Sequence, residues 1–149
     1  MKYLLLILPF LCGVAAATQS GINSQLRWAL HSPIAAALVS FLTGTILLFI
    51  IFLVFYDRSN LLPFQEWTKI SWYKWTGGAL GAFFVTVIIL TAQKVGATNL
   101  FALIISGQLI TALLYDHFGI LGFKHHPISF IRLLGVAFLL LGAWLINKK

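Results

Sequence analysis

A polar stretch directly after the apolar N-terminal run contains the first residues that could do chemistry. Gln19, Asn23 and Arg27 are spaced four residues apart, so on a helix they share one face. Amides both donate and accept hydrogen bonds, and they suit a polar or zwitterionic solute better than a bare cation. At membrane depth such side chains must face protein or water. These three residues on one helical face predict either a solute-binding surface or hydrogen-bonded contacts between helices. Arg27 is also a candidate for coupling or ion pairing.

A second group of polar residues lies near and after the middle of a later apolar run. Gln108 falls near mid-span, where an amide is either a solute ligand or a helix-contact device. Asp116 and His117 close the same run, and an acid at a helix C-terminus opposes the helix dipole. Arg132 or Lys124 is therefore expected to compensate it. The group is a proton or cation coupling site or, as its position near the membrane surface favours, an interfacial ion pair.

These residues must be positioned by membrane helices, because five apolar segments pass the length of about 20 residues that a bilayer requires. The predicted helices cover about residues 3–26, 33–56, 72–93, 98–118 and 128–146. Connections are short, so residues 1–149 are expected to form one transmembrane domain. An uncleaved first helix is favoured over a cleaved signal peptide, although Ala15-Ala16-Ala17 resembles a cleavage site.

Composition supports an all-α integral membrane protein and excludes other classes. Hydrophobic residues make up 60% of the 149 residues and charged residues only 9%, whereas soluble domains have about a quarter charged. The ten Lys and Arg residues sit mostly at segment ends, which suits anchoring at lipid headgroups rather than binding nucleic acid. No enzyme motif occurs, and the lone Cys12 and adjacent His125-His126 make no metal pattern. We expect no enzyme activity, metal or cofactor.

Small residues recur four apart on two predicted helices. Gly13, Ala17 and Gly21 follow one another on the first helix, and Gly77 and Gly81 lie on the third. Small side chains at this spacing let membrane helices approach closely. These positions are predicted to be packing surfaces.

The distribution of basic residues bears on orientation in the membrane. One predicted face carries Lys2, Arg58, Lys69, Lys74, Lys124 and Arg132, and the other carries Arg27, Lys94, Lys148 and Lys149. Six against four is a weak bias under the positive-inside rule. The alternatives are a single topology with a cytoplasmic N-terminus, or dual topology. Two oppositely inserted copies would form an inverted repeat.

Several short motifs, in order, resemble the YdcZ-like branch of the drug/metabolite transporter superfamily. They are Gln19-x-Gly21-x-Asn23-x-x-Leu26, Ser40-Phe41-x-x-Gly44, Trp75-x-Gly77-Gly78-x-x-Gly81-Ala82, Gly96-Ala97, Gly107-Gln108, Asp116-His117-Phe118-Gly119 and Arg132-Leu133-Leu134-Gly135. The resemblance implies a five-helix bacterial inner-membrane protein equivalent to half of a ten-helix inverted-repeat transporter. It further implies a small-solute exporter acting as an antiparallel homodimer or with a paired homologous chain. The chain departs from small multidrug-resistance proteins, because its first helix has no acid.

Three functions are compatible with these residues. The favoured one is alternating-access transport of a polar or zwitterionic solute, with a cavity lined by Gln19, Asn23 and Gln108. A structural or regulatory membrane subunit would use the same polar face to dock a partner. A passive channel for a small solute or ion is the third. Membrane lipid and a small-molecule substrate are the expected partners.

Overall fold

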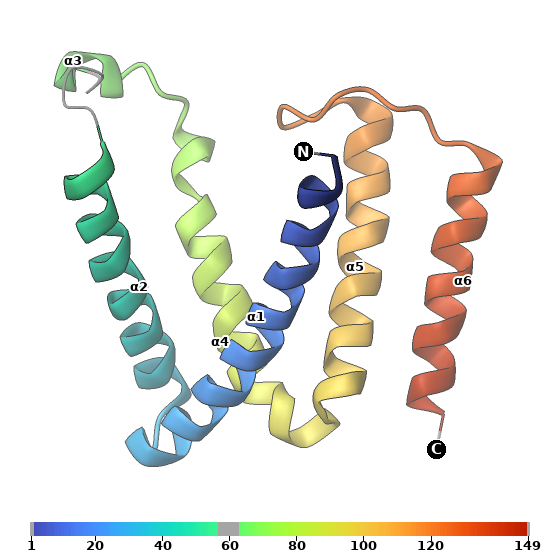
Figure 1. Cartoon of the computed structure of the whole chain (residues 1–149), viewed down its shortest axis with the longest axis horizontal. Coiled ribbons are helices and arrows are strands. Elements are labelled where there is room, and N and C mark those ends of the chain that lie inside the picture. Colours follow the sequence, from blue (N-terminus) through green and yellow to red (C-terminus); the bar gives the residue numbers. More distant parts are fainter. Residues whose placement is uncertain (1, 57–62, 149) are drawn as a thin grey trace. The chain divides into compact units, whose positions relative to one another are not determined.

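The computed structural model describes residues 2–56 and 63–148, with side chains from residue 7 onward. This part of the chain is helical and contains no strand. Its elements are α1 (Lys2–Leu30), α2 (Pro33–Phe55), α3 (Phe64–Trp67), the 3-10 helix η2 (Trp72–Trp75), α4 (Gly77–Val95), α5 (Ala97–Phe118) and α6 (Phe130–Asn147) (Figure 1).

Within the described residues, four segments are long and apolar enough to cross a membrane, which confirms the all-α integral membrane class. They are Pro33–Phe55, Trp72–Val95, Ala97–Phe118 and Phe130–Asn147. α1 has 29 residues and a length of about 43 Å at 1.5 Å per residue. That length is enough to cross a bilayer, and the C-terminal half of α1 carries the polar stretch with Gln19, Asn23 and Arg27. That α1 spans the membrane as the fifth helix stays a prediction.

The chain divides into two compact units, Met1–Gln93 and Lys94–Lys149. In the first, α1 and α2 form a hairpin around His31, which has a φ of 52°. Ser32 caps α2, because its hydroxyl accepts a hydrogen bond from Ala35 N at 3.2 Å. Proline follows at the first helical position, where the absence of an N–H costs nothing. The hairpin therefore follows from local capping signals.

The buried core of the first unit is small and lies near that turn. Ala36 and Ala37 of α2 cluster with Val85 and Ile89 of α4, and Leu26 of α1 packs against them. Most large apolar side chains instead point outward, as on α2, where nearly every residue after position 40 is exposed. Such faces need lipid as their solvent.

Several predicted boundaries differ from the structure, three of them in ways that local structure explains. α1 continues four residues beyond the predicted end at Leu26, to Leu30, so Arg27 is helical. The third predicted helix begins as η2 before α4 starts at Gly77. The last helix starts at Phe130 rather than at residue 128, because Ser129 takes the cap position and accepts a hydrogen bond from Arg132 N at 3.3 Å. Helix ends depend on such local caps, which apolar periodicity does not reveal.

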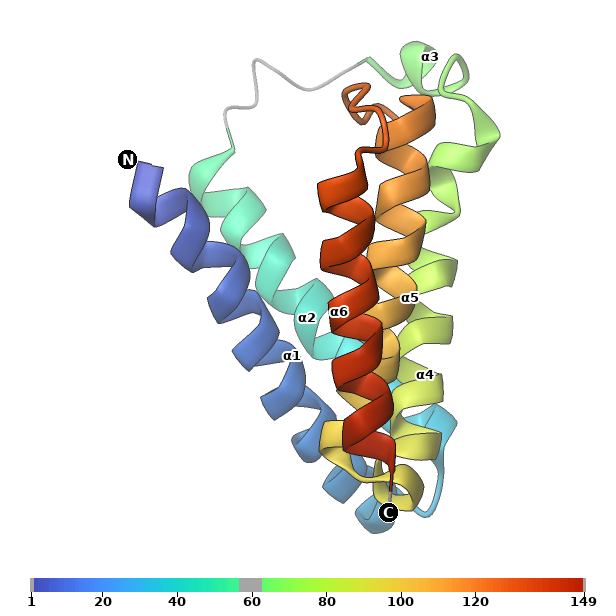
Figure 2. The same ribbon diagram turned by 90° about the vertical axis from the view of Figure 1, so that its right-hand side faces the viewer.

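In the second unit, α5 and α6 lie side by side and antiparallel (Figures 1 and 2). α5 ends at Gly119, whose φ of 61° lies in the left-handed region. The following turn is closed by a hydrogen bond from His126 N to Asp116 O at 2.7 Å. This turn brings the start of α6 back to the end of α5.

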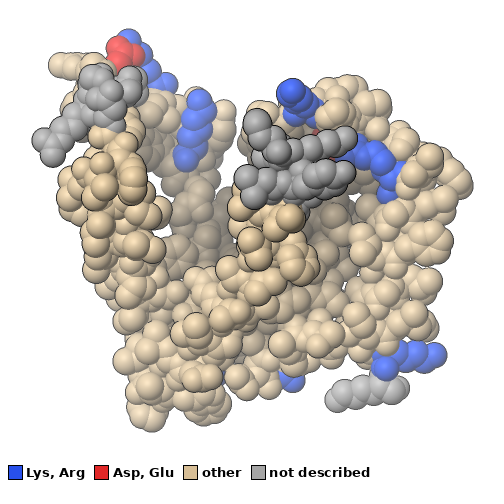
Figure 3. All heavy atoms as spheres, viewed as in Figure 1, with Lys and Arg blue, Asp and Glu red and all other residues tan. Residues whose placement is uncertain are grey.

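Aromatic residues form an exposed segment between α2 and α4. The rings of Trp67 and Trp75 lie 5.9 Å apart, and Phe64 and Trp72 are exposed. Tryptophans in this arrangement suit a membrane–water interface. On the face shown in Figure 3, basic and acidic side chains lie near helix ends, while the middle of the helices is uncharged.

Candidate functional site

The buried face of α1 is polar. Ser20, Asn23 and Ser24 are the buried polar residues of the described chain, and all three lie on this helix within two turns. On the opposite side, Ile22 is more than half exposed. The helix thus presents apolar groups outward and polar groups to α2 and α4, as membrane transport helices do.

Two predicted amides meet at one hydroxyl of α2. Asn23 Nδ2 donates to Ser40 Oγ at 3.1 Å, and Gln19 Nε2 donates to the same oxygen at 3.4 Å. Asn23 is buried, whereas Gln19 is exposed. Because Ser40 accepts both hydrogen bonds, its own hydroxyl hydrogen can be donated to a third group. The arrangement can therefore offer donors and acceptors to a polar solute.

Arg27 points inward to α4. Its Nη1 donates to Ile89 O at 3.0 Å and to Leu90 O at 3.5 Å, and its guanidinium carbon lies 5.7 Å from the centroid of the Trp28 ring. The side chain is half-buried. Among the described residues, the two ion pairs join Lys69 to Glu66 and Arg132 to Asp116, so neither involves Arg27.

Ser24 adds a buried polar atom to the same face. Its side chain is fully buried, and its hydroxyl has no hydrogen-bond partner among the described residues. An unsatisfied hydroxyl in an apolar environment is costly. The polar face of α1 is therefore not fully satisfied in this conformation.

Gln108 lies in the second unit and is exposed on α5. The neighbouring Ser106 hydroxyl bonds its own backbone, at Ala102 O, over 2.7 Å. The structure thus unites Gln19 with Asn23, while the grouping of Gln108 with them stays a prediction.

Asp116 pairs with Arg132 rather than with Lys124, joining the end of α5 to the start of α6. Arg132 also donates to His126 O at 3.1 Å, and His117 Nδ1 accepts from Ile128 N at 3.3 Å. These contacts all tie the α5–α6 turn together. The interfacial ion-pair interpretation fits them, and a coupling role stays a prediction.

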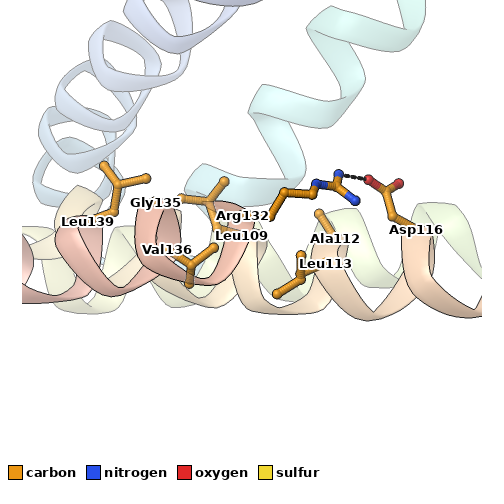
Figure 4. A pocket seen from close by; sticks show the side chains of 8 residues that line it. All are labelled: Leu109, Ala112, Leu113, Asp116, Arg132, Gly135, Val136 and Leu139. Atoms are coloured by element: carbon orange, nitrogen blue, oxygen red, sulfur yellow. Dashed lines mark hydrogen bonds and ion pairs between the residues drawn. The ribbon is translucent and has the colours of Figure 1, made fainter. Parts of the chain in front are cut away.

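A groove of about 240 Å³ lies between α5 and α6, with the ion pair at one end (Figure 4). Its lining residues are Leu109, Ala112, Leu113, Asp116, Arg132, Gly135, Val136 and Leu139. Apart from the ion pair it is apolar, so it suits hydrocarbon better than a polar solute. Among the described residues, no three His, Cys, Asp or Glu side chains gather in a way that could hold a metal ion.

The predicted packing glycines differ in their surroundings. A Cβ at Gly81 would meet the Phe41 ring at 3.5 Å, whereas Gly13, Gly21 and Gly77 have no atom within 4 Å of that position. Ala17 is likewise exposed. Gly81 thus lies against α2, whereas packing of Gly13, Gly21 and Gly77 against another helix stays a prediction and would require a contact that the described residues do not make.

Sequence reasoning missed Ser20 and Ser24 of this polar face and its partner Ser40 on α2. Ser40 stands in an otherwise apolar run, where a single serine usually bonds its own backbone. Ser24 follows Ser20 by four residues, a spacing that could have placed both on the same face as Asn23. Neither signal identifies a partner on another helix.

Comparisons with known proteins agree with this membrane architecture. The family model described as "Putative inner membrane exporter, YdcZ" matches residues 4–145. The chain is 30% identical over 147 residues to the "Inner membrane protein YdcZ" of Escherichia coli (strain K12), covering 97% of this chain and 96% of that protein. No solved structure matches.

These matches confirm the predicted inner-membrane location, and they support a transporter rather than an enzyme. The match extends over nearly the whole chain, including both units and the polar face of α1. On these grounds the chain is a multi-pass inner-membrane protein that belongs to the YdcZ family of inner membrane exporters.

Proposed function

We propose that this protein exports a small polar or zwitterionic solute by alternating access, as an antiparallel dimer. The observation that carries the proposal is the polar cluster on α1 and α2, where the amides of Gln19 and Asn23 share the hydroxyl of Ser40. Gln108 completes the site in this proposal. The amides and the hydroxyl supply neutral donors and acceptors, which hold a polar solute without trapping an ion.

The antiparallel dimer gives this site its place at the centre of an inverted repeat. Transporters of that architecture bind their solutes near the bilayer midplane, between the repeats. The open small-residue positions Gly13, Ala17 and Gly21 offer a surface on which a second copy can approach α1 closely. A paired homologous chain inserted in the opposite sense would satisfy the same geometry.

A ligand screen followed by transport tests the proposal. A solute that binds only the folded protein raises its unfolding temperature, so a thermal-shift screen of purified protein identifies the solute. Saturable counterflow of that solute in liposomes containing only this protein is the expected result. A flux that does not saturate would indicate a channel. Absence of any flux would indicate a structural or regulatory subunit.

Single amide variants then test the site itself. Gln19→Ala, Asn23→Ala and Gln108→Ala should each weaken solute binding by about 1–3 kcal/mol, roughly tenfold to a hundredfold or somewhat more, because each removes a hydrogen bond to the solute. Thr18→Ala is the matched control, since this exposed hydroxyl bonds Val14 O of its own helix at 2.9 Å. If the amide variants bind the solute normally but no longer dimerise, these amides hold helices together, and their assignment to the solute site is wrong.

A further inference from the structure

The guanidinium of Arg27 is the charged group of the α1 polar face. It lies one helical turn beyond Asn23 and on the same side of the helix. An arginine at a membrane surface ordinarily extends its head toward water and lipid headgroups. Arg27 instead points toward α4 and donates to two of its carbonyls through a single nitrogen, Nη1.

Two of the three nitrogen atoms of this guanidinium remain available. Nη2 and Nε, which form one edge of the guanidinium, have no hydrogen-bond partner among the described residues, and Arg27 as a whole is only half-buried. That edge is the planar fork that binds carboxylates through two parallel hydrogen bonds.

The charge of Arg27 also lacks an acidic partner within the described chain. Glu66 and Asp116 are paired with Lys69 and Arg132, and Asp57, the third acid, lies outside the described residues. Carbonyl dipoles and the Trp28 ring compensate the cation only in part. A half-buried cation of this kind favours an anionic ligand.

From these observations we infer that Arg27 binds a carboxylate of the transported solute, which narrows the solute to a small organic acid or a zwitterion. The inference rests on the proposed transport function. Arg27 and Asn23 are four residues apart, or about 6 Å along the helix axis. The solute therefore carries its carboxylate about 6 Å from a hydroxyl or amino group that bonds Asn23 and Ser40.

Three probe molecules with the same carbon chain but a different terminal charge separate the effect of ligand charge on binding from the effect of ligand shape. They are 4-hydroxybutyrate, its neutral amide 4-hydroxybutanamide, and the cation 4-hydroxybutylammonium. Thermal unfolding of the full chain in lipid nanodiscs is measured against the concentration of each. Only the carboxylate should raise the unfolding temperature at low concentration, with the amide needing roughly tenfold to a hundredfold more, because it loses the charge-assisted bonds.

Variants assign this preference to Arg27. Arg27→Gln should remove the difference between carboxylate and amide, and Arg27→Lys should retain a weaker preference as a point charge without the fork. Lys94→Gln is the matched control, because it removes one exposed positive charge at the end of α4. It should leave the preference unchanged. If Arg27→Gln does not fold, the reduced preference of Arg27→Lys still decides the question.

Several results would overturn the inference. Equal stabilisation by carboxylate and amide, or none by any probe, would show that Arg27 does not select an acid. An Arg27→Gln variant that is less stable but keeps the preference would show that Arg27 only compensates the C-terminal ends of α1 and α4. The counterflow experiment decides transport separately, so a carrier that moves neutral solutes would leave the proposed function standing.

Discussion

At the scale of single residues, the polar face of α1 combines satisfied and unsatisfied groups. Asn23 is buried with its amide bonded to Ser40. One position away, the Ser24 hydroxyl is equally buried but has no hydrogen-bond partner in the part of the chain that the structure describes. A protein selected only for stability would place alanine there, because Ala36 and Ala37 already fill the neighbouring core of the unit.

Replacing Ser24 by alanine should therefore stabilise the protein. Removing an unsatisfied buried hydroxyl is expected to raise the free energy of unfolding by about 1 kcal/mol. Denaturation in mixed detergent micelles measures this change. Ser106→Ala serves as the control, since the Ser106 hydroxyl bonds Ala102 O and its loss should give no gain. A destabilised Ser24→Ala that also loses transport would show that the hydroxyl finds a partner in another conformation.

Gly119 is a residue whose backbone conformation disfavours a side chain. Its φ of 61° is left-handed, and an added Cβ would lie 3.4 Å from the Cβ of His125. Gly119→Ala is expected to lower the free energy of unfolding by about 1–2 kcal/mol from backbone strain. Gly142→Ala, at a helical glycine of α6 with open space around it, should not destabilise. Equal effects at both positions would contradict this account.

At the scale of elements, the α5–α6 hairpin depends on polar contacts at its turn. The pair between Asp116 and Arg132 is partly buried, with side-chain exposures of 23% and 38%. The Lys69–Glu66 pair of the first unit is more exposed, at 70% and 41%. Water screens an exposed pair more strongly, so the first pair should contribute more to stability.

A double-mutant cycle measures that difference. Asp116→Asn and Arg132→Gln should each destabilise the protein, with a coupling energy of about 1 kcal/mol between them. The same cycle at Glu66 and Lys69 should give about 0.3–0.5 kcal/mol or less, as for an exposed pair on one helix. Asp116→Asn should affect solute affinity less than the α1 amide variants do. Loss of binding in Asp116→Asn alone would move the solute site to the membrane surface.

At the scale of the whole molecule, the number of spans decides the orientation of the termini. Among the residues that the structure describes, four segments qualify as spans by hydropathy, and α1 would be the fifth. Five spans place the termini on opposite faces of the membrane, and two copies inserted in opposite senses would form an inverted pair. Basic residues are distributed almost evenly between the two predicted faces, so they favour neither direction of insertion strongly.

Reporters fused to the C-terminus should therefore give signal from both sides of the membrane. Adding two lysines at the His31 turn should shift the population to one orientation, because basic residues are retained in the cytoplasm. Two lysines added beside Lys124, on the opposite predicted face, should shift it the other way. If the native chain reports from one side only, an antiparallel homodimer is excluded and a differently oriented partner chain is required.

The sequence alone determined the membrane class, the approximate helices and the polar stripe of α1. These features follow from local properties, since a span needs a continuous apolar length and residues four apart share a helical face. The predicted segments at 33–56 and 98–118 differ from α2 and α5 by one residue at one end each. Motif order also identified the family, which the matched residues 4–145 confirm.

Only the tertiary structure decided which groups these polar residues contact. In the structure, Ser40 accepts hydrogen bonds from the amides of Gln19 and Asn23, and Ile89 O accepts one from Arg27. Asp116 forms its ion pair with Arg132 rather than with Lys124. The contacts of Arg27 join positions 62 and 63 residues apart. Such contacts depend on how helices rotate and pack, and the outward apolar faces constrain that rotation weakly because lipid solvates every apolar face alike.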